Sequence, residues 1–173
     1  MKRRLFTLTV FAMASVCLSS CIANNDVRAS LSIDRDSYRS GEDIFVTLVL
    51  ENTSSEGILL PARMALNFRG QPTTLRDVYF VITTPSGHEA EFSQLTRVPS
   101  IEESGFIELG PGGQRKARYD LSLFYVPFQD YATKEYGQYT VQAVYENESD
   151  PGDGRSAWKG KLTSNTVTFT LEP

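Results

Sequence analysis

Short runs of alternating apolar and polar residues fill the chain from Ala29 onward, and clusters of Gly, Pro, Asn and Ser separate them. The clearest run, 43–51, predicts a strand with four apolar side chains on one face, Ile44, Val46, Leu48 and Leu50. Hardly any stretch keeps the period of an amphipathic helix. The pattern therefore predicts an antiparallel sandwich or barrel.

Further strands are predicted over other runs of this kind, at 30–35, 57–60, 75–83, 89–92, 106–109, 115–121, 138–145 and 165–171. The run Gly110-Pro111-Gly112-Gly113 must be a turn, because no strand ladder would tolerate it. The predicted fold class is all-β, with about eight or nine strands in a single domain.

The N-terminus has the parts of a secretory signal. Three basic residues at positions 2–4 precede an apolar run from Leu5 to Leu18, and Ser19-Ser20-Cys21 follows. The apolar run is too short to span a membrane as a helix. Residues 1–20 are therefore predicted to be a signal peptide.

The motif Leu18-Ser19-Ser20-Cys21 resembles the bacterial lipobox. The resemblance implies that the Cys21 thiol carries diacylglycerol, that cleavage precedes Cys21, and that the new amino group is acylated. The alternative is an ordinary signal with a chance cysteine. A bacterial lipoprotein would be anchored to a membrane by these acyl chains. Residues 21–29 would then be its lipidated N-terminus and tether, and residues 30–173 its folded domain. Ile22 differs from the aspartate of an inner-membrane retention signal, which favours the outer membrane if the cell has two.

Removing residues 1–20 changes the charge and the cysteine count. Of 17 basic residues three leave with the signal, so 14 face 21 acidic residues and the mature net charge is −7. Such acidity argues against nucleic acid as a partner. Cys17 also leaves and Cys21 would carry lipid, so no disulfide, cysteine-ligated zinc or cysteine nucleophile is expected.

The segment 136–141 resembles the tyrosine corner of immunoglobulin-like domains. Tyr139 follows the glycine turn at Gly137 and stands two positions before the apolar Val141. This arrangement predicts that the Tyr139 hydroxyl bonds back to the backbone of the preceding loop.

Together with other strand and turn residues, the corner makes the chain similar to immunoglobulin-like modules of exported bacterial proteins. These residues are Tyr38, Gly41-Glu42, 44–50, Asn52-Thr53, Leu109, Pro111-Gly112, 120–122, 137–141 and 164–167. The pattern is also similar to the non-catalytic N-terminal domain of bacterial deuterolysin-type metallopeptidases, and more faintly to the intracellular proteinase inhibitor of bacilli. The resemblance implies an immunoglobulin-like antiparallel β-sandwich without a disulfide, and it carries architecture rather than chemistry.

Candidate catalytic and metal sites are weak. Deuterolysin-like peptidases use two histidines, and this chain has only His88, beside the turn 85–87. No Gly-x-Ser-x-Gly elbow is present. Carboxylates in the loop 146–154 could bind calcium, although a solvated acidic loop explains them better. The sequence therefore predicts no catalytic residue, no metal and no cofactor.

Two other groups of residues bear on binding. Arg115, Lys116 and Arg118 form the only basic cluster, and a strand would divide them between its two faces. The aromatic segment 121–136 would either close one end of the sandwich or bind a partner. Tyr125 and Tyr131 are its candidate partner-binding residues, because tyrosine keeps a polar group for a wet surface.

These features predict a non-enzymatic, lipid-anchored envelope protein that serves as a binding or assembly module. Such a module would present loops or an open strand edge to another envelope protein, a polysaccharide or a peptide. The alternative is a proteinase inhibitor of the cell envelope, in which a loop such as 99–105 enters a protease cleft. The expected partners are a membrane, through the lipid, and an envelope protein or a protease.

Cys21→Ser should abolish incorporation of radiolabelled fatty acid and leave the precursor uncleaved, because Cys21 is the only cysteine next to the predicted cleavage point. Metabolic labelling followed by gel electrophoresis measures both effects. Cys17→Ser is the matched control and should label normally. Continued labelling of Cys21→Ser would contradict the predicted anchor.

Overall fold

The described part of the chain folds into nine β-strands and two short helical turns. The structure is a computed structural model, and it describes residues 26–72, 76–93, 105–130 and 132–173. The strands are β1 (Val27–Ile33), β2 (Ser37–Arg39), β3 (Phe45–Asn52), β4 (Ile58–Pro61), β5 (Val78–Thr83), β6 (Phe106–Leu109), β7 (Gln114–Asp120), β8 (Gly137–Asn147) and β9 (Gly160–Glu172). The helical turns are η1 (Leu121–Leu123) and α1 (Val126–Gln129).

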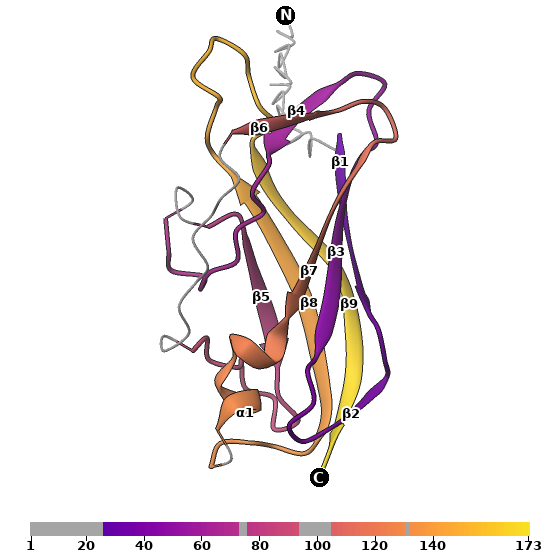
Figure 1. The fold of residues 1–173 in the computed structure, drawn as a ribbon, viewed down its shortest axis with the longest axis vertical. Coiled ribbons are helices and arrows are strands. Elements are labelled where there is room, and N and C mark those ends of the chain that lie inside the picture. The colour runs from indigo at the N-terminus through magenta and orange to yellow at the C-terminus, as the bar shows by residue number, and fades with distance from the viewer. Residues whose placement is uncertain (1–25, 73–75, 94–104, 131) are drawn as a thin grey trace, which may run out of the picture.

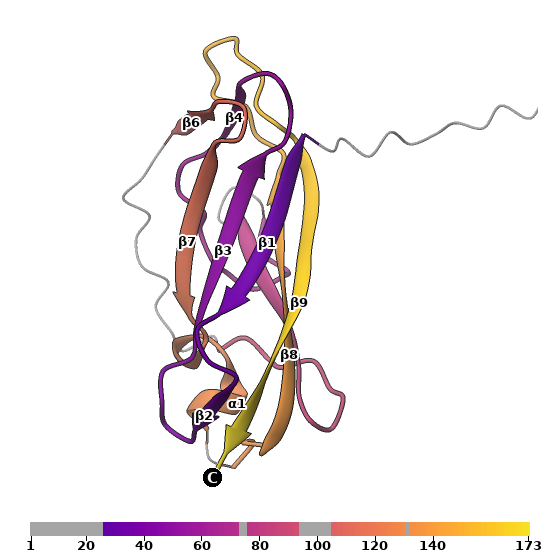
Figure 2. The same ribbon diagram turned by 90° about the vertical axis from the view of Figure 1, so that its right-hand side faces the viewer.

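Two sheets run along the long axis of the domain and face each other (Figures 1 and 2). One has the order β1-β3-β7 and the other β2-β9-β8-β5, while β4 and β6 form a third, short sheet at one end. All pairings are antiparallel except that of β2 with β9. The predicted all-β class is confirmed.

The core lies between the two long sheets. The predicted inner face of β3 is fully buried, whereas the residues that alternate with it are half-buried. From the opposite sheet, β5 contributes a matching buried row, Val78, Phe80 and Ile82. The Phe80 ring meets the Tyr119 ring of β7 edge to face at 5.3 Å. Each such aliphatic or aromatic side chain contributes about 1.5–3 kcal/mol on burial.

Several boundaries differ from those predicted. β1 begins at Val27, so residues 27–29 belong to a strand rather than to the tether. The predicted strand at 89–92 forms only isolated bridges. β2 was not predicted, because its three residues bury a single side chain, Tyr38. Residues 1–20 and Cys21 lie outside the described residues.

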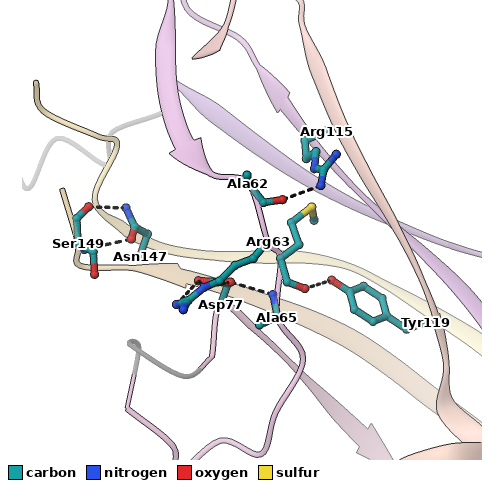
Figure 3. A network of polar contacts seen from close by, with 9 residues as sticks. Ala62, Arg63, Ala65, Asp77, Arg115, Tyr119, Asn147 and Ser149 are labelled. Carbon is teal, nitrogen blue, oxygen red and sulfur yellow. Dashed lines mark hydrogen bonds and ion pairs between the residues drawn. The ribbon is translucent and has the colours of Figure 1, made fainter. Parts of the chain in front are cut away.

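The chain leaves β4 through a crossing segment, 62–67 (Figure 3), which belongs to no sheet ladder and makes one isolated bridge, from Leu66 to Val78 of β5. Its backbone bonds partly to other backbone groups, at Gly105, Asp77 and Val78, and partly to side chains. The Arg115 guanidinium donates to the Ala62 carbonyl at 2.6 Å, and the Tyr119 hydroxyl donates to the Met64 carbonyl at 2.8 Å. Met64 has a φ of 46°, a left-handed conformation that is costly for a residue with a Cβ atom. These bonds help to hold that conformation in place.

A buried ion pair anchors the same segment. The Asp77 carboxylate is 1% exposed and accepts two hydrogen bonds from Arg63, from Nε at 2.8 Å and from Nη2 at 2.9 Å. It also accepts the Ala65 backbone N–H at 2.8 Å (Figure 3). A buried carboxylate needs such hydrogen bonds and a paired cation, because an unpaired buried charge is strongly destabilising.

The predicted tyrosine-corner hydrogen bond is present. The Tyr139 hydroxyl donates to the Glu135 carbonyl at 2.7 Å, and the Tyr139 ring stacks on Phe169 with centroids 5.2 Å apart. Burial raises the pKa of Tyr139 above its ordinary value. Gly137 at the start of β8 has a φ of 131°, which other residues rarely adopt. The corner therefore fixes where the loop ends and β8 begins.

Tyr139→Phe should lower the free energy of unfolding by about 1–3 kcal/mol, because it leaves the Glu135 carbonyl without its donor. Urea denaturation measures the change. Tyr136→Phe, on a ring that is 48% exposed, is the control and should stay within about 0.5 kcal/mol. An unchanged midpoint and slope for Tyr139→Phe would show that this hydrogen bond does not stabilise the fold.

Candidate binding surface

The aromatic segment 121–136 is organised by two helical turns. Asp120 caps η1, because its Oδ1 accepts the Ser122 N–H at 3.0 Å. Pro127 lies in the first turn of α1, where a missing N–H removes no helical bond. The segment therefore folds back against the sheets instead of forming another strand.

The expectation that Tyr125 presents its ring to a partner is wrong. Tyr125 is 2% exposed, and its hydroxyl both accepts the Phe80 N–H and donates to the Phe80 carbonyl, each at 3.1 Å. The backbone at the edge of β5, rather than water, meets the polar requirement of this hydroxyl. Burial accordingly raises the pKa of Tyr125. Tyr131 lies outside the described residues.

The other members of the segment divide between core and surface. Phe128 is buried, with its ring 5.2 Å from that of Tyr139, and Phe124 is half-buried. The large apolar side chains exposed in the described part of the chain are Leu123 at 53% and Tyr136 at 48%. Sequence reasoning missed Leu123, because its exposure depends on the short helix η1, which the pattern did not predict.

A hollow of about 350 Å³ opens beside this segment. Phe80 and Tyr125 are its buried lining residues, while Phe68 and Phe92 line it with half-buried rings. The Phe92 ring also stacks on Phe124, with centroids 5.9 Å apart. The aromatic side chains of its wall therefore pack on one another, and Arg69 and Glu89, which also line it, form an ion pair at 3.7 Å.

The outer edge of β5 is closed to an added strand. Its outward backbone groups bond to four other parts of the chain: Val78 to Ala65 and Asn67, Phe80 to the Tyr125 hydroxyl, Ile82 to Ala90, and Thr84 to His88. The distances range from 2.7 to 3.1 Å. Covering an edge in this way prevents it from pairing with another chain.

At the outer edge of β1, one side chain bonds to the backbone of one residue, Leu31. The Asn165 carboxamide accepts the Leu31 N–H at 2.8 Å and donates to the Leu31 carbonyl at 2.9 Å, as a paired strand would. Asn165 belongs to β9, which runs beside β1 (Figure 2). The same amide therefore joins the two sheets along this side.

The outer edge of β7 is different. Two hydrogen bonds at the ends of its pairing with β3 show which of its residues bond to β3. The Asn52 N–H donates to the Gly113 carbonyl at 2.9 Å, and the Leu121 N–H donates to the Ile44 carbonyl at 2.8 Å. Because the direction alternates along a strand, the backbone groups of Gln114, Lys116 and Arg118 point away from β3. No described residue bonds to the outward backbone groups of Lys116 and Arg118. Within the described part of the chain, the backbone of this edge is therefore open to an added strand.

The basic cluster lies on this open strand and divides between its faces as predicted. Arg115 is half-buried and points to the crossing segment, whereas Lys116 and Arg118 are exposed on the outer face. Trp158 is buried and stacks on Tyr145, with ring centroids 5.9 Å apart. Positive charge at the surface of β7 therefore comes from two side chains two residues apart.

The weak chemical candidates have structural explanations. His88 is exposed, and its carbonyl accepts the Thr84 N–H at 2.8 Å, which closes the predicted turn. In the acidic loop each of three carboxylates pairs with its own cation: Glu146 with Arg76, Asp150 with Lys159, and Asp153 with Arg155. The bonds from the cations lower the pKa values of Asp150 and Asp153. These carboxylates are thus committed to ion pairs.

Two findings hold for the described residues alone. They include no group of three or more His, Cys, Asp or Glu side chains placed to bind a metal ion together. No helix among them has both the length and the apolar composition needed to cross a bilayer.

Comparison with known proteins adds little. The sequence matches no protein-family model and no curated protein. Among solved structures, the chain is similar to the alkylpurine DNA glycosylase AlkC of Pseudomonas fluorescens bound to DNA containing an abasic site analog, with 15% sequence identity and a TM-score of 0.42. The match covers 86% of this chain and 31% of that chain, so this chain spans less than a third of the glycosylase. A match at this level assigns neither fold family nor function.

Tyr125→Phe should destabilise the domain by about 1–3 kcal/mol, because the buried N–H and carbonyl of Phe80 both lose their partner. It should also raise the hydrogen-exchange rate of the Phe80 amide. Exchange mass spectrometry or NMR measures that rate, and Tyr136→Phe serves as the exposed control. Unchanged protection of Phe80 would show that Tyr125 does not close the edge.

Proposed function

We propose that this chain is a non-enzymatic, lipid-anchored protein of the cell envelope that acts as a binding or assembly module. The observation that carries the proposal is the outer edge of β7, where no described residue bonds to the outward backbone groups of Lys116 and Arg118, whereas the outer edge of β5 is covered by backbone groups and by the Tyr125 hydroxyl. A strand edge with unpaired N–H and C=O groups is a template for pairing with another strand, and the cations Lys116 and Arg118 restrict which strand can pair there. Strand addition to such an edge is a common mode of peptide recognition.

An immunoglobulin-like β-sandwich is the architecture we propose for this module. Its supports are the two facing sheets and the bond from Tyr139 to the Glu135 carbonyl, which is typical of the tyrosine corner. The parallel strand β2 and the crossing segment 62–67 would be additions to that plan.

The proposed anchor would place the domain close to the bilayer. Asp26 lies five residues after Cys21, and at about 3.3 Å per extended residue the tether would reach no more than about 17 Å. Asp26 bonds to Thr53 at the end of β3 that also meets Gly113, where β7 begins. The β7 edge would therefore start near the membrane and extend away from it.

Capture from envelope extracts tests this function. Tagged, lipidated full-length protein, cross-linked in cells, should recover a defined partner at a stoichiometric ratio, and the unanchored Cys21→Ser variant should recover less of it. Recovery of a protease that the pure protein blocks at a stoichiometric dose would instead establish the inhibitor alternative. Failure to recover any partner with the lipidated protein would contradict a binding role.

A further inference from the structure

We infer that the outer edge of β7 accepts an extended segment of a partner protein as an added strand, and that acidic residues alternate with small apolar residues in that segment. The inference rests on the proposed binding function and names the chemistry of the partner. Three properties of β7 support it: the direction of its backbone groups, the charge on its outer face and the packing on its inner face.

The backbone supplies the affinity. The N–H and C=O groups of Lys116 and Arg118 point away from β3, and no described residue bonds to them. A strand laid along this edge could bond to both residues in the regular pattern of a sheet ladder. Seven residues of β7 are available, which is long enough to fix the register of a short segment.

The outer face of β7 selects an acidic partner. Lys116 is exposed, and the Arg118 side chain is 60% exposed. The Arg118 guanidinium lies 3.7 Å from the centroid of the Phe45 ring and 3.8 Å from Asp34, so it is held over the sheet. Opposite charges on neighbouring strands stabilise a pairing, and like charges destabilise it. Carboxylates at alternate positions of the added strand would face these two cations.

The inner face selects small apolar residues between the carboxylates. Ala117 lies between the two cations in sequence and is half-buried, packed against the core. An apolar side chain of the added strand on this inner face would extend the apolar surface beside Ala117. A polar side chain there would lose water without gaining a partner.

A second copy of this chain fits the edge poorly. Pairing two β7 edges would bring Lys116 and Arg118 of each copy near the same cations of the other, and such like-charge pairs are destabilising. The charge on this edge therefore favours a different chain.

Two substitutions at one position separate charge from backbone pairing. Lys116→Ala removes the cation and keeps the outward N–H. Lys116→Pro removes both, and it should keep the pairing with β3, because this N–H points away from that strand. Thermal unfolding of both variants checks that the domain remains folded.

The probe is a fluorescein-labelled peptide of four glutamate–valine repeats, measured by anisotropy against the full chain without its signal. We expect saturable binding that weakens as salt is added. Lys116→Ala should weaken it by up to about fivefold, as for loss of one exposed ion pair. Lys116→Pro should weaken it by a further 2- to 12-fold or so, as for loss of one hydrogen bond. A lysine–valine peptide should not bind.

Two measurements remain decisive if Lys116→Pro does not fold. Hydrogen exchange on the wild-type protein should show that the peptide protects the amides of Lys116 and Arg118. A peptide N-methylated on alternate residues, along the edge that faces β7, should not bind. Protection elsewhere, or equal binding of the methylated peptide, would overturn strand addition.

The remaining outcomes separate this inference from the proposed function. If Lys116→Pro recovers the envelope partner as well as wild type does, strand addition at β7 is wrong and the binding role stands. If the peptide binds as described but envelope capture recovers nothing, the binding role is wrong and the chemistry of the edge stands. A concentration-dependent dimer that Lys116→Pro abolishes would assign the edge to a second copy.

Discussion

The ion pair of the buried Asp77 carboxylate with Arg63 is the interaction that fixes the crossing segment on the β2-β9-β8-β5 sheet. Asp77 lies just before β5, binds Arg63 and the Ala65 N–H, and so ties the crossing segment to the start of the strand. The Asp77 backbone carbonyl also accepts the Glu146 N–H, which extends the β5–β8 ladder. One residue thus connects the short sheet, the crossing segment and the longer sheet. Since a lone buried charge is strongly unfavourable, the two elements that meet at Asp77 stabilise each other.

A second principle recurs along the sheet edges, where side chains act in place of strands. A hydroxyl can both accept and donate, and so can a carboxamide, so either can bond to the N–H and the carbonyl of one residue. Tyr125 does this for Phe80, and Asn165 does it for Leu31. Each side chain thereby takes the backbone groups to which a neighbouring strand would otherwise bond. The β7 edge differs, because no described residue bonds to the outward backbone groups of Lys116 and Arg118.

Sequence reasoning found the elements whose alternation is regular and missed those held by distant side chains. β3 and β6 were placed to within two residues, because burial on one face imposes a period of two. The Tyr139 corner was found because its turn and its apolar neighbour are local in sequence.

The crossing segment and the burial of Tyr125 have no such local signal. Met64 is held by Tyr119, which is 55 residues away in the chain, and the Tyr125 hydroxyl meets Phe80 across 45 residues. The open edge of β7 could be recognised only after the pairing partners of β5 and β1 were known. A pattern along the chain predicts strands, but it does not reveal which strand edge remains unpaired.

The described chain enters at one end of the domain and leaves at the other (Figure 1). The first and last long strands, β1 and β9, lie side by side, and the start of β1 and the end of β9 are at opposite ends of the domain. A mechanical force applied to those tips would act along the strands. Hydrogen bonds in the β1–β3 and β8–β9 ladders lie across that direction, so they would have to yield together in shear rather than open one after another. The topology is thus suited to withstand tension between the N-terminal end, which we propose is anchored, and anything held at the far end.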